Sequence, residues 1–177
     1  YLPLVITGVH AAGQPELPGE LPVGERPTRE RMPFNTVRDY AAAYRSGSVT
    51  PVEVAEQVIT AIAKSDQTIP AMHAFSASYA EDIRAQAAES TARIKAGNPR
   101  SIFEGVPVAI KDELDLVPYP STVGTSFLGA QPVTKDSHVA ARLRAGGALL
   151  VGKTNMHEIG IATNGENVHH GRIANPY

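Results

Sequence analysis

Two short apolar runs separated by one helical pattern constrain the fold of this chain most strongly. Residues 106–110 (VPVAI) and 148–151 (ALLV) are rich in branched aliphatic side chains, as are strands buried on both faces of a sheet. Between them, Asp136 and Ser137 begin a predicted helix that Gly146 and Gly147 end. A strand, a helix and a second strand at this spacing predict a βαβ unit, and therefore an α/β fold.

The region after residue 35 carries further helical signals and one strand signal. Thr36 and Asp39 suit the start of a helix, and residues 50–53 (TPVE) form a capping box with proline at the first helical position. Ser78 is expected to cap a third helix, which residues 97–99 (GNP) stop. The predicted elements are helices over 36–47, 50–64, 78–95 and 155–161, and a strand over 72–77.

Residues 1–35 differ from the rest of the chain in their proline content. They hold six of the 14 prolines, a density that cannot sustain helical hydrogen bonding. We expect an extended N-terminal arm or a loose tail, and the apolar opening YLPLVI favours docking on a partner surface. The predicted organisation is therefore an arm over 1–35 followed by a globular part over 36–177.

The overall composition excludes several classes of function. The chain has 16 Lys and Arg against 18 Asp and Glu, so its charge gives no case for binding nucleic acid or an anionic membrane. It has no cysteine, which rules out thiolate catalysis and Cys-based metal sites. No apolar run approaches the roughly 18 residues of a membrane span. By default we expect a soluble cytoplasmic protein, with membrane association only if its substrate is a lipid.

One segment matches a nucleotide-binding pattern in its letters alone. Residues 147–154 (GALLVGKT) fit the P-loop pattern GxxxxGK[ST]. A P-loop curls its backbone amides around phosphates after a strand has ended, but here the variable positions Ala-Leu-Leu-Val are themselves the predicted strand. A buried strand cannot also be a phosphate cradle, so we interpret the match as coincidental.

Other catalytic and metal-binding patterns are incomplete. His157 and Glu158 begin an HExxH motif, but Ile161 stands where the second histidine would be. Asp136, Ser137 and His138 have the letters of a catalytic triad, yet chain neighbours cannot form a relay, so a helix N-cap is the preferred interpretation. Neither GxSxG nor SxxK occurs. The six histidines are expected on the surface or hydrogen-bonded in the core, and no metal site is predicted.

Lys111 is the strongest catalytic candidate in the chain. It directly follows the apolar run 106–110, at the carboxyl end of a predicted strand, where ligand sites of open α/β sheets lie. Burial there would disfavour an ammonium and allow a neutral lysine to act as a general base. Asp112, Glu113 and Asp115 favour the charged form instead. From the spacing, a base and a lysine paired with Asp112 or Glu113 are equally supported.

Four segments together resemble the amidase signature family in order and spacing. They are residues 103–113 (FEGVPVAIKDE), 121–126 (STVGTS), 146–158 (GGALLVGKTNMHE) and 164–176, with NGEN at its start and NP at its end. The resemblance covers about residues 36–177 and implies the N-terminal part of the amidase signature fold, a mixed sheet covered by helices. It also accounts for the GKT letters without a nucleotide.

The resemblance implies a hydrolase that cleaves carboxylic amides with a Ser–cis-Ser–Lys triad and needs no metal or cofactor. Lys111 falls on the family's lysine, the general base that acts through a bridging serine. Gly160, Ile161, Ala162 and Thr163 match a segment that lines the acyl side of the site. The two serines and the oxyanion amides belong to motifs beyond Tyr177. The expected partner is a C-terminal chain or segment bearing both serines, and the substrate is a small-molecule amide.

Within the family, residues 118–122 (PYPST), residues 156–158 (MHE) and the proline-rich arm are most similar to plant-type fatty acid amide hydrolases. Because a base without its nucleophile cannot perform this chemistry, we expect the chain to be part of a cleaved two-chain enzyme or of a longer polypeptide. A non-catalytic amidase-derived binding subunit and an amidotransferase A-type subunit stay open as alternatives. A homodimer is also compatible with the sequence.

Overall fold

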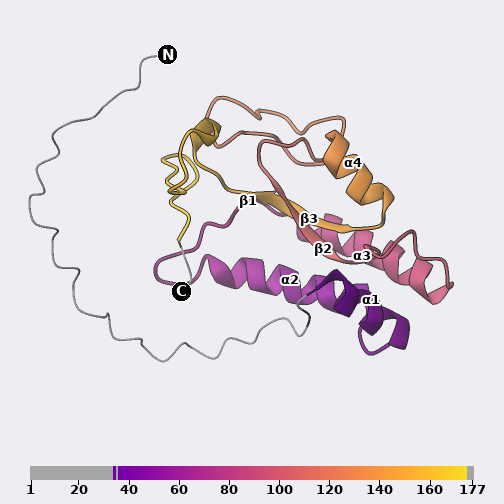
Figure 1. The fold of residues 1–177 in the computed structure, drawn as a ribbon. Helices are drawn as coiled ribbons and strands as arrows, with labels where there is room; N and C mark the ends of the chain where they lie inside the picture. Colours follow the sequence, from indigo (N-terminus) through magenta and orange to yellow (C-terminus); the bar gives the residue numbers. More distant parts are fainter. Residues whose placement is uncertain (1–33, 35, 175–177) are drawn as a thin grey trace, which may run out of the picture. The chain divides into compact units, whose positions relative to one another are not determined.

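The computed structural model describes residue 34 and residues 36–174, so the predicted arm lies outside the described residues apart from Phe34. The described chain forms an α/β unit of four α-helices and three strands (Figure 1). In chain order the elements are α1 (Val37–Ser46), α2 (Pro51–Ser65), β1 (Phe75–Ala77), α3 (Ala80–Lys95), β2 (Pro107–Lys111), α4 (His138–Ala145), β3 (Leu149–Thr154) and the 3₁₀ turn η1 (Glu158–Gly160).

The three strands form one mixed sheet in the order β1-β3-β2. β2 and β3 run parallel, with α4 as the connection between them, and β1 pairs antiparallel with β3. The predicted βαβ unit and the mixed sheet covered by helices are thereby confirmed. Every residue of β3 except Thr154 is buried, as expected for a central strand.

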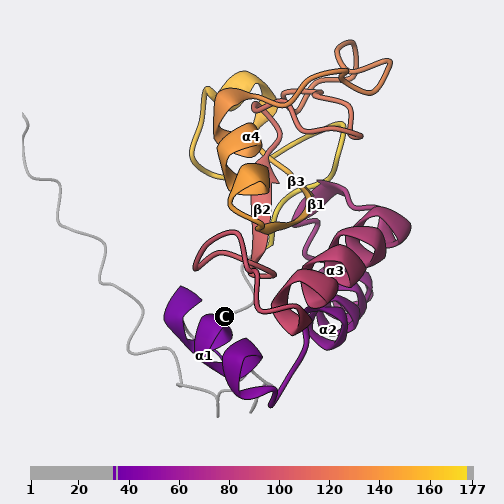
Figure 2. The same ribbon diagram turned by 90° about the vertical axis from the view of Figure 1, so that its right-hand side faces the viewer.

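Alternation along β3 divides the core into two layers. Leu149 and Val151 face α2 and α3, where they pack with Ala55, Ile83 and Ala87. Leu150 faces the opposite side, in a cluster with residues of β2, α4 and the loop after β2. Two views at right angles show α2 and α3 on one side of the sheet and α4 on the other (Figures 1 and 2).

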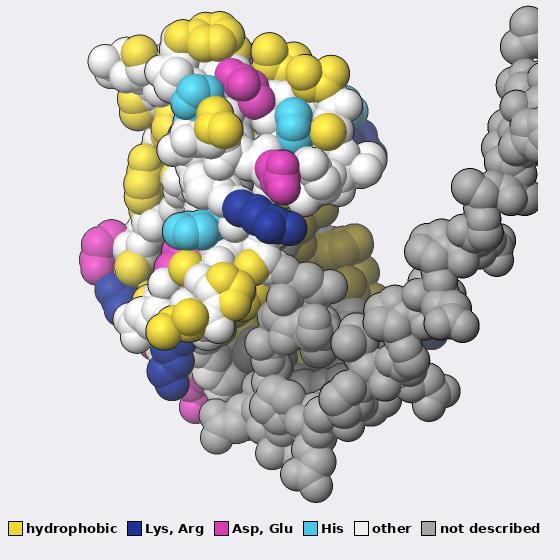
Figure 3. All heavy atoms as spheres, turned by 90° about the vertical axis from the view of Figure 1, so that its left-hand side faces the viewer, with side chains coloured by type: hydrophobic (Ala, Val, Ile, Leu, Met, Phe, Trp, Pro, Cys, Tyr) yellow, Lys and Arg dark blue, Asp and Glu magenta, His cyan; other side chains and the backbone are white. Residues whose placement is uncertain are grey.

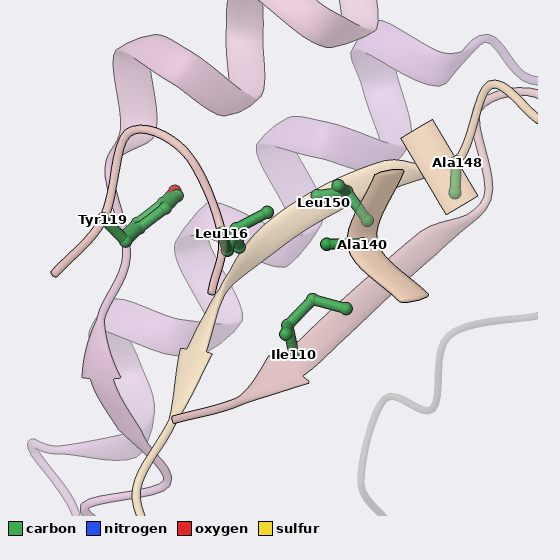
Figure 4. Close-up of a cluster of buried hydrophobic side chains, with 6 residues drawn as sticks. All are labelled: Ile110, Leu116, Tyr119, Ala140, Ala148 and Leu150. Atoms are coloured by element: carbon green, nitrogen blue, oxygen red, sulfur yellow. The ribbon is translucent and has the colours of Figure 1, made fainter. Parts of the chain in front are cut away.

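The cluster on the α4 side anchors the loop that follows β2. Its buried members are Ile110, Leu116, Tyr119, Ala140, Ala148 and Leu150, which gather on one side of the two parallel strands (Figure 4). Leu116 and Tyr119 are completely buried. Their burial holds the chain beyond Lys111 against the sheet, which fixes the course of the loop near the strand ends.

The expectation that the run 106–110 is buried on both faces is wrong. Val106 and Ile110 are buried, but Ala109 is exposed and Pro107 and Val108 are only half-buried. Within the described sheet β2 is an edge strand whose outer side no other strand covers. An apolar run therefore did not distinguish an edge strand from a central one.

Capping chemistry places three helices where the sequence predicts them. Thr36 with Asp39 and Thr50 with Glu53 form reciprocal capping boxes at α1 and α2, and Gly47 ends α1 in the left-handed conformation. Ser137 accepts a hydrogen bond from the backbone N–H of Ala140 and caps α4. These caps satisfy backbone groups that the first and last helical turns leave unpaired.

Two local predictions fail. Ser78 does not cap α3; its hydroxyl instead donates to the carbonyl of Val151 at 2.8 Å, and α3 starts after Tyr79 without a side-chain cap. The helix predicted over 155–161 is only the single turn η1, because Ile159 has φ +53° and interrupts helical backbone geometry. In both places a contact or conformation set by the tertiary fold replaces the local preference.

A buried carboxylate secures the opposite end of β2 from Lys111. Glu104 is 3% exposed and accepts hydrogen bonds from the Ser90 hydroxyl at 2.6 Å, the Arg93 guanidinium at 3.0 Å and the Arg100 backbone N–H at 2.8 Å. Burial raises the pKa of Glu104, but the bonds from Arg93, Ser90 and Arg100 outweigh it and hold the pKa below its ordinary value.

Replacing Glu104 with glutamine is expected to lower the free energy of unfolding near pH 7 by about 2 kcal/mol, since three donors lose a charged acceptor. Because the folded-state pKa is depressed, the stabilisation is fully present above the unfolded-state pKa and is lost as the pH falls through the folded-state pKa. Urea unfolding of both proteins should show a constant difference from pH 6 to 8 that shrinks under acid conditions. A difference that grows with acidity would contradict this role.

Candidate active site

Lys111 is the last residue of β2 and lies beside Thr154, the last residue of β3. Its Nζ forms an ion pair with Glu113 Oε1 at 3.1 Å. The carboxyl ends of two parallel strands thus meet at the candidate base, which is the position where α/β sheets place ligand sites.

The burial predicted for Lys111 is not found in the described chain. Its side chain is 49% exposed and that of Glu113 is 45% exposed. The reason is the edge position of β2: Ile110 points into the core, and the next side chain along the strand points away from it. The alternative in which Lys111 pairs with Glu113 describes the observed contact.

The adjacent residue, Asp112, forms the buried ion pair of this region. Its carboxylate Oδ1 lies 2.9 Å from the Nζ of Lys153, and the two side chains are 1% and 0% exposed. Asp112 also accepts a hydrogen bond from the hydroxyl of Thr122 and one from its backbone N–H at 3.3 Å. The carboxylate thereby joins β3 to the loop after β2.

Lys153 is the lysine of the P-loop-like segment 147–154 (GALLVGKT), and its surroundings exclude a phosphate-binding role. Gly152, Lys153 and Thr154 all belong to β3, as the interpretation of the motif requires. The Nζ of Lys153 donates to Ser121 Oγ at 2.9 Å and to the Pro120 carbonyl at 3.2 Å, besides its contact with Asp112. These three oxygens match the three donors of an ammonium, so the Lys153–Ser121 pair is not a nucleophile–base dyad.

A bulge in β3 directs Lys153 to this side of the sheet. Leu150 pairs with Val108 and Lys153 with Ile110, so β3 has two residues where β2 has one. The extra residue reverses the alternation, and Lys153 reaches Pro120 and Ser121 beside the cluster that contains Leu150. Sequence periodicity alone would place Lys153 on the other face.

Tyr119 supports the loop that carries these oxygens. Its ring stacks on Tyr79 with centroids 4.4 Å apart, and its hydroxyl accepts a hydrogen bond from the Tyr79 backbone N–H at 3.2 Å. Burial raises the pKa of Tyr119 to about 12, so the phenol stays neutral at physiological pH. The stack connects the start of α3 to the loop behind Lys111.

Two β-branched residues adopt left-handed backbone conformations in segments linked to Asp112, the neighbour of the candidate base. Val123 and Ile159 both have φ +53°, and each is followed by a glycine with positive φ. The Ile159 N–H donates to the Val123 carbonyl at 2.9 Å, and the Val123 N–H donates to the Asp112 carbonyl at 3.2 Å. Such conformations cost on the order of 1–3 kcal/mol each and gather at functional sites, so the pair makes this region a candidate for one.

Two buried asparagines hold the segments after β3. The Asn167 side-chain amide donates to the carbonyls of Gly124 and Met156 at 2.8 and 2.7 Å. The Asn155 side-chain amide donates to the backbone carbonyls of His73 and Gly171, each at 3.0 Å. The sequence did not predict a site role for four residues that are polar and buried here, although each lies in a segment that resembles the family: Asn155, Asn167, Asp112 and Lys153. Their burial, which identifies them, is visible only in the structure.

One residue of the predicted acyl-side segment, Gly160, lies near the carboxylate that pairs with Lys111. A Cβ added at Gly160 would lie 3.9 Å from Glu113 Oε2, the carboxylate that pairs with Lys111. Ile161 is 79% exposed, and Ala162 and Thr163 are also exposed. No described contact joins any of these four residues to Lys111, so their acyl-side role stays a prediction.

His169 and His170 are adjacent in the chain but contact different partners. His169 Nε2 lies 3.2 Å from Glu158 Oε1, whereas His170 Nε2 lies 3.1 Å from the Thr125 carbonyl. Across the described residues, no three histidine or acidic side chains are grouped as a metal site would need. The side of the molecule where β3 ends presents histidine, acidic and apolar side chains close together (Figure 3). In the same part of the chain, every helix is too short or too polar to cross a lipid bilayer.

Comparison with known proteins supports the same family. The Amidase family model matches residues 53–177. Fatty acid amide hydrolase from Oryza sativa subsp. indica is 42% identical over 154 residues, 85% of this chain and 25% of the relative. The Medicago truncatula fatty acid amide hydrolase is 43% identical over 142 residues, 80% and 23% of the two chains. The chain thus spans about a quarter of the length of these relatives.

Among solved structures, the native peptide amidase from Stenotrophomonas maltophilia superimposes with a TM-score of 0.75 at 26% identity, covering 82% of this chain and 30% of that protein. The family match covers more than half of the chain, and it includes β2, β3 and Lys111. Fold and sequence therefore agree, and the chain belongs to the amidase signature family.

Proposed function

We propose that this chain supplies the general base, Lys111, of an amide hydrolase whose nucleophilic and bridging serines lie in polypeptide outside this chain. One observation carries the proposal: in a member of an amidase family, Lys111 stands where the carboxyl ends of two parallel strands meet. Its neighbour Asp112 bonds the loop at Val123, and Glu113 lies near Gly160. The half-exposed side chain of Lys111 leaves room for a second partner besides Glu113.

In the proposed mechanism, a neutral Lys111 accepts a proton from the bridging serine, which takes one from the nucleophilic serine. The nucleophile forms an acyl–enzyme as the amide C–N bond breaks, and the proton returns along the same path to the departing amine. Water then hydrolyses the ester by the reverse proton route. Every step uses side chains alone and needs no metal or cofactor.

The substrate class that fits best is a lipophilic amide, such as a fatty acid amide. Ile159 and Ile161 are 58% and 79% exposed on either side of Gly160, next to the carboxylate that pairs with Lys111. An apolar acyl chain would bury these two side chains, and removing their apolar surface from water is favourable in free energy. Gly160, Ile161, Ala162 and Thr163 are proposed to line the acyl side.

Covalent labelling tests this proposal. The chain, purified together with any polypeptide that accompanies it, is treated with a fluorophosphonate probe and digested for mass spectrometry. We expect the label on a serine outside this chain, and hydrolysis of an N-acylethanolamine that the label blocks.

The alternatives give different results in the same experiment. A non-catalytic binding subunit would bring neither label nor hydrolysis, and an amidotransferase A-type subunit would release ammonia from glutamine instead. A label on Ser121 or Ser126 would contradict the proposed division of the active site. Intact-mass analysis and N-terminal sequencing identify the accompanying polypeptide.

A further inference from the structure

A completely buried ion pair lies directly behind the candidate base, and no step of the proposed chemistry uses it. Lys153 is 0% exposed and Asp112 is 1% exposed, with 2.9 Å between Nζ and Oδ1. Removing two charges from water costs several kcal/mol per ion, which their attraction only roughly offsets. A gain in stability therefore explains this ion pair poorly, and the contacts of the two side chains suggest a different role.

The pair joins three separate segments by their side chains. Asp112 follows the end of β2, and Lys153 belongs to β3. Lys153 donates to Pro120 and Ser121, while Asp112 accepts from Thr122, so the loop after β2 is attached to both charges. Two buried charges thus form a cross-link between two strands and one loop.

The backbone of Asp112 is fixed as completely as its side chain. Its N–H donates to the Thr154 carbonyl at 3.2 Å, and its carbonyl accepts from Val123 at 3.2 Å. The side chain of Lys111, by contrast, has one ion-pair partner, the half-exposed Glu113. The position from which the Lys111 side chain leaves the sheet is therefore held by the pairing of Lys111 with Thr154 and by its neighbour, Asp112.

We propose that the Asp112–Lys153 pair positions Lys111 for proton transfer, and that its purpose is catalytic alignment rather than stability. This inference rests on the proposed role of Lys111. Asp112 and Lys153 are positioning residues, since neither is accessible to a substrate. Because a misplacement of about 1 Å at a reacting group costs on the order of 100-fold in rate, a small shift of the strand end suffices for a large effect.

The test compares Asp112→Asn, Lys153→Met and the double variant in the assembled enzyme. Each single variant leaves one buried charge without a partner and is expected to have a lower Tm. The double variant leaves no unpaired charge, so its Tm should recover. Its kcat should nevertheless stay about 100-fold below wild type, with KM changed by less than about threefold, because the cross-link is lost.

Glu104→Gln provides the matched control. It breaks a buried charge pair at the opposite end of the same strand, where Glu104 contacts Arg93 at 3.0 Å. It is expected to lower Tm and to leave kcat of the folded enzyme unchanged. A kcat of the double variant equal to wild type, or an equal kcat loss in Glu104→Gln, would overturn the positioning role.

A second comparison decides the question if the double variant does not fold. Thr122→Val removes the hydroxyl that donates to Asp112 and leaves the Asp112–Lys153 ion pair in place. We expect kcat to fall about tenfold at constant KM. Thr122→Ser keeps the hydroxyl and should retain kcat; equal kcat for both variants would refute the inference. If Lys111→Ala stays active, the proposed function fails instead, so the two failures are distinguishable.

Discussion

Replacing Lys111 with alanine is expected to lower kcat for amide hydrolysis by on the order of 1000-fold or more, with little change in Tm. The loss follows from removing the proposed general base, a role worth 10²- to 10⁴-fold in rate. Stability should change little because the side chain is 49% exposed and its one ion pair, with Glu113, lies at the surface. Steady-state hydrolysis and thermal unfolding of the assembled enzyme measure the two effects.

Two further variants separate proton transfer from charge. Lys111→Arg can keep the ion pair with Glu113, but a guanidinium does not lose its proton in proteins, so we expect it to be as inactive as Lys111→Ala. Lys135→Ala removes an exposed lysine from a loop and should leave kcat unchanged. Near wild-type turnover of either Lys111 variant would exclude the general-base role.

Gly152→Ala is expected to cause the largest loss of stability of any single methyl addition to β3, about 3 kcal/mol or more. Gly152 has φ +138°, and an added Cβ would collide with the Ala77 carbonyl and lie 3.1 Å from Ser78 Cα. Those atoms are backbone of β1 and of the residue after it, so the clash cannot be relieved by a side-chain rotation. Urea unfolding of the two proteins measures the difference.

Gly47→Ala is the control for this prediction. Gly47 also has positive φ, +72°, but nothing lies within 4 Å of an added Cβ. It should cost about 1 kcal/mol, the penalty of the left-handed conformation alone. Equal losses for the two variants would show that the close approach of β1 to β3 contributes nothing.

Local physics explains which features the sequence predicts correctly. The capping boxes at Thr36 and Thr50 use groups within three residues of each other, so their letters suffice to place α1 and α2. The two apolar runs with one helix between them favour a parallel crossover, and β2, α4 and β3 form one. The same segments place Lys111 at the carboxyl end of a strand.

The failed predictions depend on neighbours distant in sequence. Ser78 binds Val151, 73 residues away, instead of capping α3. Burial of β2 depends on whether another strand lies on its outer side, and the sequence of residues 106–110 does not specify that neighbour. The predicted helix over 155–161 gives way to a left-handed Ile159 whose N–H binds Val123 across the site.

The sequence by itself determined the α/β class, the starts of α1, α2 and α4, the family and the strand end at which Lys111 lies, because these depend on short-range periodicity, caps and sequence motifs. Only the tertiary structure decided that Lys153 is the buried lysine and Lys111 the half-exposed one. For Lys153 the physical reason is the bulge in β3, which reverses the side-chain alternation and turns its side chain toward Asp112. For Lys111 the reason is the edge position of β2. Pairing register and strand order both exist only in the folded sheet.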